Sequence, residues 1–173
     1  MTDGELVAHI QATGDPAAFG ELVRRHEARI RALLRRLTAH DAARADDLAQ
    51  DTFFAAFRHI ATFRGEAAVA TWLVRIAVRQ YLSDARRKRP EPVAEVGDVV
   101  EPERDDPVAL VDLDRGLSAI RDEQRLVVVL TFAHGLTHAE VAELTGWPLG
   151  TVKTHALRGR AALRDALTGD DDE

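Results

Sequence analysis

The chain has 173 residues, of which 46% are hydrophobic and 30% are charged. This balance is typical of a folded globular protein and excludes wholesale disorder. The absence of cysteine excludes disulfide frameworks, cysteine-ligated zinc and thiol nucleophiles. The N-terminus lacks the pattern of a signal peptide, and no stretch approaches the roughly 20 apolar residues that span a bilayer. We therefore expect a cytoplasmic protein without membrane insertion.

The formal net charge of −6 is distributed unevenly along the chain. Residues 1–90 carry 15 basic and 11 acidic side chains, whereas residues 91–116 carry 2 basic and 9 acidic ones. Residues 117–168 carry 6 basic and 5 acidic side chains, and residues 169–173 add four acids. The pattern predicts two mildly basic segments that an acidic tether separates and an acidic tail follows.

The first segment has the apolar periodicity of a helical bundle. Asp15 as N-cap and Pro16 at the first helical position predict a helix over 17–37. Further helices are predicted from about 46 to 60 and from about 69 to 89, with a glycine-bearing connection over 61–66. The residues expected to face inward are Phe19, Leu22, Val23, Ile30, Leu33, Leu34, Leu37, Leu48, Phe53, Phe57, Ile60, Trp72, Leu73, Ile76, Ala77 and Leu82.

The stretch from Arg89 to about Pro107 holds four of the six prolines and most of the tether's acids. It cannot bury enough apolar surface to fold alone, which predicts a flexible linker. Helical periodicity resumes near Val108 and continues to Leu130. We therefore divide the chain into a first helical domain (1–90), an acidic linker (91–110), a second helical domain (111–168) and an acidic tail (169–173).

The second domain contains a helix-turn-helix pattern. Thr137 and Glu140 form a capping box, Gly146-Trp147-Pro148 ends the short helix, and Gly150 opens another that reaches about Leu167. In such a motif the second helix lies in the major groove of DNA. The residues expected to meet DNA are Lys153, Thr154, His155, Leu157 and Arg158, whereas Val152, Ala156 and Leu163 are expected to pack inward. The predicted fold class is all-α, with two small helical domains.

Three segments together resemble the extracytoplasmic-function sigma factors, the smallest members of the main bacterial sigma family. The resemblance covers about residues 16–168. Its segments are 46–53 (DDLAQDTF), 63–66 (FRGE) with 71–77 (TWLVRIA), and QR at 124–125 with 137–143 and 150–154 (GTVKT). The resemblance implies sigma region two in the first domain and sigma region four in the second. It also implies promoter recognition as a subunit of RNA polymerase.

The first segment resembles the polymerase-binding helix of the family. The resemblance implies contact with the clamp coiled coil of the largest polymerase subunit, and it implies contact of the second domain with the flap of the second-largest subunit. The alternative is a solvated acidic helix face, which charge runs usually are. The implied polymerase-binding residues are Asp46, Asp47, Leu48, Gln50, Asp51 and Phe54.

The second segment resembles the part of the family that melts the −10 element and holds a flipped base of the non-template strand. Binding single-stranded bases requires cations along the backbone and surfaces for stacking. We expect Trp72 to be mostly structural, and the basic cluster at 86–89 either to hold phosphates or to complement a helix end. The implied −10 residues are Phe63, Arg64, Gly65, Ala70, Thr71, Trp72, Arg75, Arg79, Arg86 and Arg87.

The third segment resembles the −35-reading part of region four. The implied −35 residues are Thr137, Lys153, Thr154, His155, Leu157 and Arg158. Relatives often have Ser-Arg where this chain has Thr154-His155, Leu-His where it has Ala156-Leu157, and Asn in place of Arg79. These departures leave the preferred −35 and −10 sequences undetermined. Gly159, which costs roughly 1 kcal/mol relative to alanine within a helix, has no functional explanation from the sequence.

The resemblance also implies an anti-sigma factor that holds the two domains. Two rival interpretations remain open: a sigma-like mimic that titrates an anti-sigma factor, and a stand-alone helix-turn-helix regulator. We expect no enzymatic activity, cofactor, metal or small-molecule substrate. His134 and His138 do not form a zincin motif, and no phosphate-binding glycine loop is present.

Overall fold

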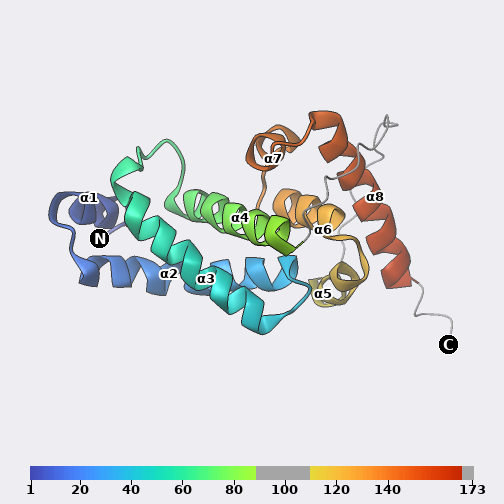
Figure 1. The fold of residues 1–173 in the computed structure, drawn as a ribbon, viewed down its shortest axis with the longest axis horizontal. Helices are drawn as coiled ribbons and strands as arrows, with labels where there is room; N and C mark the ends of the chain where they lie inside the picture. The colour runs from blue at the N-terminus through green and yellow to red at the C-terminus, as the bar shows by residue number, and fades with distance from the viewer. Residues whose placement is uncertain (89–109, 169–173) are drawn as a thin grey trace. The chain divides into compact units, whose positions relative to one another are not determined.

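The computed structural model describes residues 1–88 and 110–168 (Figure 1). The chain forms two compact units, residues 1–89 and 90–173, and the described residues of both are helical with no strand. The all-α prediction with two helical units is confirmed. The predicted acidic linker and tail lie outside the described residues, except that Leu110 begins a helix of the second unit.

The first unit consists of α1 (Asp3–Thr13), α2 (Pro16–Leu37), α3 (Ala42–His59), the 3₁₀ turn η1 (Ile60–Thr62) and α4 (Val69–Lys88). The long helices α2, α3 and α4 pack on one another, and α1 packs on α2 and on η1 (Figure 1). Their apolar stripes form one core. Its fully buried members include Leu22, Ile30, Leu33, Leu34, Leu37, Leu73, Val74 and Val78.

Local signals explain the starts of α2 and α3. The Asp15 carboxylate accepts a hydrogen bond from the amide of Ala17 at 2.8 Å, and Pro16 follows it. The carboxylate of Asp41 accepts from the amide of Arg44 at 3.0 Å, so α3 begins at Ala42, four residues before the predicted start. That prediction was wrong because the first turn carries no large apolar side chain.

Two further expectations about the first unit require correction. The sequence did not predict α1, although Thr2 and Glu5 form a capping box at its start. Phe57 was expected in the core, but its side chain is 40% exposed and packs edge-on against Phe19, with the ring centroids 4.9 Å apart.

The second unit consists of α5 (Leu110–Ala119), α6 (Asp122–Val128), the π-helical turn η2 (Val129–Ala133), α7 (His138–Thr145) and α8 (Leu149–Thr168). Helix α8 packs on α5, α6 and α7. The core includes Leu117, Leu126, Val127, Leu130, Val141, Val152 and Leu163. The helical pattern predicted from Val108 to Leu130 corresponds to two helices, α5 and α6, and the turn η2.

Candidate functional site

One exposed stripe runs along α3. Asp47, Gln50, Asp51 and Phe54 are all exposed, and their spacing of three or four residues places them on one face of the helix. The Phe54 side chain is 70% exposed, the highest fraction of any large hydrophobic residue of the described chain. We call these four residues the α3 stripe. It combines two carboxylates with one aromatic ring.

Two further residues predicted to bind polymerase make contacts within the first unit. The Asp46 carboxylate forms an ion pair with the guanidinium of Arg31 on α2, so it also ties α3 to α2. Leu48 is 4% exposed and belongs to the core. The assignment of Leu48 to a binding surface was therefore wrong, because its side chain lies on the inward face of α3.

The loop between η1 and α4 is held at both ends. The Phe63 ring packs against Trp72, with the ring centroids 5.1 Å apart, and both side chains are half-buried. At the other end, the carbonyl of Ala68 accepts from the amides of Thr71 and Trp72 at 3.0 and 3.1 Å. Arg64 is exposed, and Gly65 has a φ of +74°, the left-handed region that glycine adopts without strain.

Cations follow the loop along α4. Thr71, Arg75, Arg79 and Arg86 are spaced by multiples of about one turn and share a helix face. Arg79, Arg86 and Arg87 are exposed, whereas Ala70, Thr71 and Arg75 are half-buried. The structure thus brings the predicted −10 residues onto one loop and the helix that follows it.

The second unit contains the predicted helix-turn-helix. The hydroxyl of Thr137 accepts from the Glu140 amide at 3.2 Å, and the Glu140 carboxylate accepts from the Thr137 amide at 2.9 Å. Gly146 ends α7 with a φ of +75°. On α8, Lys153 and Arg158 are exposed and Leu157 is half-buried. The motif therefore presents both of the predicted cations, Lys153 and Arg158, on its second helix.

Two residues predicted to meet DNA are buried instead. The Thr154 hydroxyl donates to the carbonyl of Gly150 at 2.9 Å, and the residue is 3% exposed. His155 is 7% exposed, and its ring packs on Trp147 with centroids 5.4 Å apart. Both expectations were wrong, because these side chains lie among the packed residues of the motif.

The environment of His155 disfavours its charged form. Neither ring nitrogen has a hydrogen-bond partner among the described residues. Burial lowers the pKa of His155, the nearby Glu123 carboxylate opposes this effect, and the Arg158 guanidinium adds to it. A neutral imidazole therefore fills this position.

The structure explains two residues of the second unit to which the sequence assigned no packing role. Arg125 is 4% exposed, donates to the carbonyls of Leu117 and Ile120 at 3.1 Å each, and pairs with Asp122. It thereby caps the end of α5, where the backbone leaves α-helical carbonyls without partners. Gly159 faces α6, and a Cβ built there would lie 2.7 Å from a Val128 methyl group.

Comparison with known proteins identifies the fold. The family model for Sigma-70 region 2 matches residues 22–91, and the model for Sigma-70 region 4 matches residues 110–163. The extracytoplasmic-function sigma factor SigM of Mycobacterium tuberculosis is 37% identical over 96% of this chain and 85% of that protein. This chain is an extracytoplasmic-function sigma factor.

Other sigma factors are similar over nearly their whole length. The RNA polymerase sigma-H factor of Pseudomonas aeruginosa is 33% identical to this sigma factor over 95% of this chain and 93% of that one. The solved structure of CnrH, in complex with the cytosolic domain of CnrY, superimposes with a TM-score of 0.63 at 26% identity, covering 98% and 99% of the two chains. The sigma factor RpoE of Bartonella quintana, bound to the anti-sigma factor NepR, shares the fold with a TM-score of 0.64 at 24% identity, covering 88% and 98%.

The sigma family acts in transcription initiation without enzymatic chemistry of its own, and neither the mimic nor the stand-alone regulator is favoured by these matches. Within residues 1–88 and 110–168, no group of three or more His, Cys, Asp or Glu side chains could hold a metal ion. No helix in the described part of this sigma factor is long and apolar enough to cross a membrane.

Proposed function

We propose that this sigma factor binds core RNA polymerase through the α3 stripe. The main support for this role is the exposure of the Phe54 ring beside the carboxylates of Asp47 and Asp51. Asp47 and Asp51 lie one turn apart, and like charges at this spacing destabilise a helix by a few tenths of a kcal/mol. A basic coiled coil on the largest subunit would relieve this repulsion and cover the exposed ring.

The first unit then receives the −10 element. The loop that starts at Phe63 and the cation face of α4 combine an aromatic pair with exposed arginines, the groups that single-stranded DNA requires. Arg64 and Arg79 follow the backbone of the non-template strand, and Arg86 and Arg87 hold phosphates of the adjoining duplex. A base flipped from the stack enters the loop, so binding energy rather than chemistry opens the DNA.

The second unit reads the −35 element with fewer residues of α8 than the sequence implied. Lys153, Leu157 and Arg158 remain on the accessible side of α8, whereas Thr154 and His155 support the helix from within. Arg158 and Lys153 contact guanine or phosphate, and a good bidentate contact discriminates by about 1–3 kcal/mol. The second unit also binds the flap of the second-largest polymerase subunit.

An anti-sigma factor holds this protein inactive in our proposal, and the protein acts in the cytoplasm, where the polymerase transcribes. The support is that CnrH, which shares the fold, was solved in complex with a protein partner, the cytosolic domain of CnrY.

An electrophoretic mobility shift with and without core polymerase tests the proposed function. A promoter fragment should shift only when core enzyme and the sigma factor are both present. A shift without core enzyme would indicate a stand-alone regulator. The lack of any shift with core enzyme on promoters mapped in cells would favour the mimic and contradict the proposal.

Charge reversal separates the polymerase-binding surface from general electrostatics. Asp51→Arg should weaken binding to core polymerase in a competition assay, because it places a cation against a basic partner. Glu27→Arg is the matched control, since Glu27 is an exposed acid on α2 rather than on α3. Equal affinities of the two variants would reject the stripe as the polymerase contact.

Alanine substitution tests the −35 surface. Arg158→Ala should reduce transcription from promoters with an intact −35 element while core binding is retained. Arg121→Ala is the control, because Arg121 is exposed in the same unit but precedes α6 rather than lying on α8. An unchanged output of Arg158→Ala in reconstituted transcription would remove Arg158 from the assigned surface.

A further inference from the structure

Helix α1 lies outside residues 22–91, the part of the first unit that matches the region 2 family model. Its own signals explain why it forms: Thr2 and Glu5 make a capping box, with hydrogen bonds of 2.6 and 3.3 Å. A helix of this length is marginal alone, so it depends on tertiary burial. Leu6, Val7 and Ile10 provide it, each at most 4% exposed.

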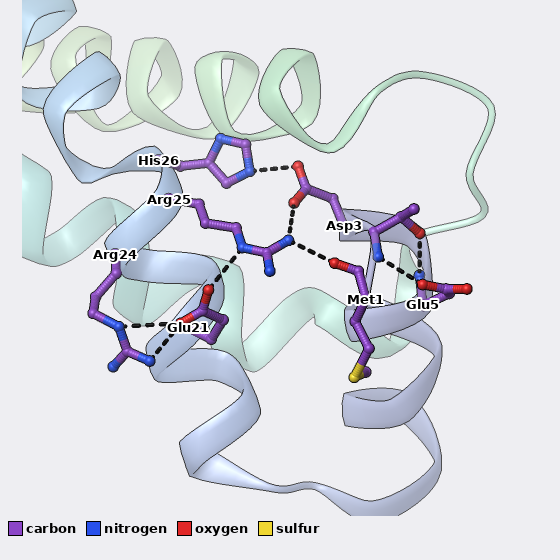
Figure 2. Close-up of polar contacts among 8 residues, drawn as sticks. Met1, Asp3, Glu5, Glu21, Arg24, Arg25 and His26 are labelled. Atoms are coloured by element: carbon purple, nitrogen blue, oxygen red, sulfur yellow. Dashed lines mark hydrogen bonds and ion pairs between the residues drawn. The ribbon is translucent and has the colours of Figure 1, made fainter.

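The beginning of α1 is fastened to α2 by a polar network (Figure 2). Asp3 lies between two neighbouring side chains of α2, with one carboxylate oxygen 2.8 Å from His26 Nε2 and the other 3.2 Å from Arg25. Arg25 also donates to the carbonyl of Met1 at 3.0 Å and to Glu21 at 2.8 Å. The helix is thus fixed in position at its N-terminal end.

The other end of α1 reaches η1, the turn that precedes the loop between η1 and α4. We call this loop, which starts at Phe63, the −10 loop. The Gln11 side-chain amide donates to the carbonyl of Ile60 at 2.8 Å and to the carbonyl of Phe63 at 2.9 Å. These two residues bracket η1, and the amide of Phe63 also donates to the Ile60 carbonyl at 3.1 Å. One side chain of α1 therefore clamps both ends of the turn.

The clamped turn sets the direction of the loop. Phe63 is the residue whose ring packs on Trp72, and Arg64 follows it directly into the exposed part of the loop. With its carbonyl held by Gln11 and its ring held by Trp72, Phe63 has little freedom to turn. A loop that is already ordered loses less conformational entropy when it binds its ligand. Its affinity for the ligand is therefore higher even though no new contact is made.

We propose that Gln11 is a positioning residue for the −10 loop: it does not touch DNA, but it holds Ile60 and Phe63 so that the loop is ordered before a base enters. The proposal rests on the proposed function for the identity of the ligand. Its structural part, the ordering of residues 60–66 by Gln11, is independent of that function and is measured separately.

The test compares Gln11→Met with Thr13→Ala. Methionine keeps the length of the side chain but donates no hydrogen bond. Thr13 lies on the same helix, and its hydroxyl donates to the carbonyl of His9 and accepts from the amide of Asp15, so the control removes hydrogen bonds at the end of α1 that do not involve residues 60–66. Amide hydrogen exchange of the full chain measures the ordering of the loop. Binding of a single-stranded oligonucleotide carrying the non-template −10 sequence to the reconstituted holoenzyme measures the functional effect.

Gln11→Met should speed exchange of the Phe63 amide, which donates to the Ile60 carbonyl, by about tenfold, the factor that one net hydrogen bond of about 1.4 kcal/mol provides. Exchange in the buried turns of α2 and α4 and affinity for core polymerase should stay at the wild-type level. Oligonucleotide affinity should fall by about three- to tenfold. Thr13→Ala should change none of these measurements.

Two results would overturn the proposal. Unchanged exchange of the Phe63 amide would show that Gln11 does not order the turn that leads into the loop. Faster exchange with unchanged oligonucleotide affinity would show that DNA binding gains nothing from that order. A failure of the proposed function is distinguishable from both, because the wild-type holoenzyme itself would then not bind the oligonucleotide.

Discussion

Gly159 lies within α8 where this helix packs against Gln124 and Val128 of α6. A Cβ at this position would lie 2.7 Å from Cγ2 of Val128 and 3.2 Å from both Cβ and the carbonyl oxygen of Gln124. Val128 is 2% exposed and its β-branched side chain is restricted in rotation, so the methyl group cannot turn away easily. The carbonyl oxygen belongs to the backbone of α6 and moves only if that helix moves.

Two opposing effects determine the result of Gly159→Ala. Alanine improves helix propensity by about 1 kcal/mol, whereas overpacking of a filled core typically costs about 1–3 kcal/mol and occasionally more. Since one contact is far below the van der Waals distance and another is to backbone, we expect the upper part of that range. The net expectation is a loss of about 1–2 kcal/mol, or about 4 to 16 °C in the melting temperature of a unit of this size.

Gly150→Ala is the matched control on the same helix. No atom lies within 4 Å of a Cβ built at Gly150, so this change should stabilise the unit by up to about 1 kcal/mol. Thermal unfolding followed by Trp147 fluorescence, in a Trp72→Phe background, reports the second unit in both variants. If Gly159→Ala raised the melting temperature as Gly150→Ala does, the close approach of α6 and α8 would be refuted.

Two further predictions concern buried polar groups of the second unit. Arg125→Met should lower the free energy of unfolding by about 3 kcal/mol, since it leaves the carbonyls of Leu117 and Ile120 without donors; a loss below about 1 kcal/mol in urea titration would contradict the capping role. Because burial lowers the pKa of His155, the unfolded chain binds more protons near its ordinary pKa of about 6.5, and stability falls as the pH drops through that value. The melting temperature of the wild type should therefore decline more steeply than that of His155→Leu between about pH 7.5 and about pH 5.5, and parallel profiles would show that His155 does not contribute.

Helix capping and apolar spacing predicted most of the helices. The α2 signal, Asp15-Pro16 before an apolar stripe, and the α7 signal, the Thr137 capping box, each satisfy backbone amides locally. Such signals can be recognised in the sequence because the residues that make them lie within one helical turn of each other. The same type of signal stands at Thr2, but the short helix that follows depends on burial against α2, which the local sequence does not reveal.

The surfaces were less predictable than the helices that carry them. Periodicity correctly placed Val152, Ala156 and Leu163 toward the core of the second unit. It could not place His155, because an imidazole suits either a DNA contact or a buried position. The ring of Trp147 and the packing of α6 against α8 bury His155, and both of these contacts come from outside α8. Leu48 shows the converse case, since a residue inside a recognised motif can serve the core rather than the partner.

The amino-acid sequence by itself determined the all-helical class and the two-part organisation, because both depend on short-range periodicity, capping and composition, and its resemblance to the sigma family indicated the order of the sigma regions. Only the tertiary structure decided which residues of those regions reach the surface, why Gly159 has no side chain, and that Gln11 holds a turn some fifty residues further along the chain. These features depend on distances between helices, and a local pattern contains no information about the neighbour that a helix will meet.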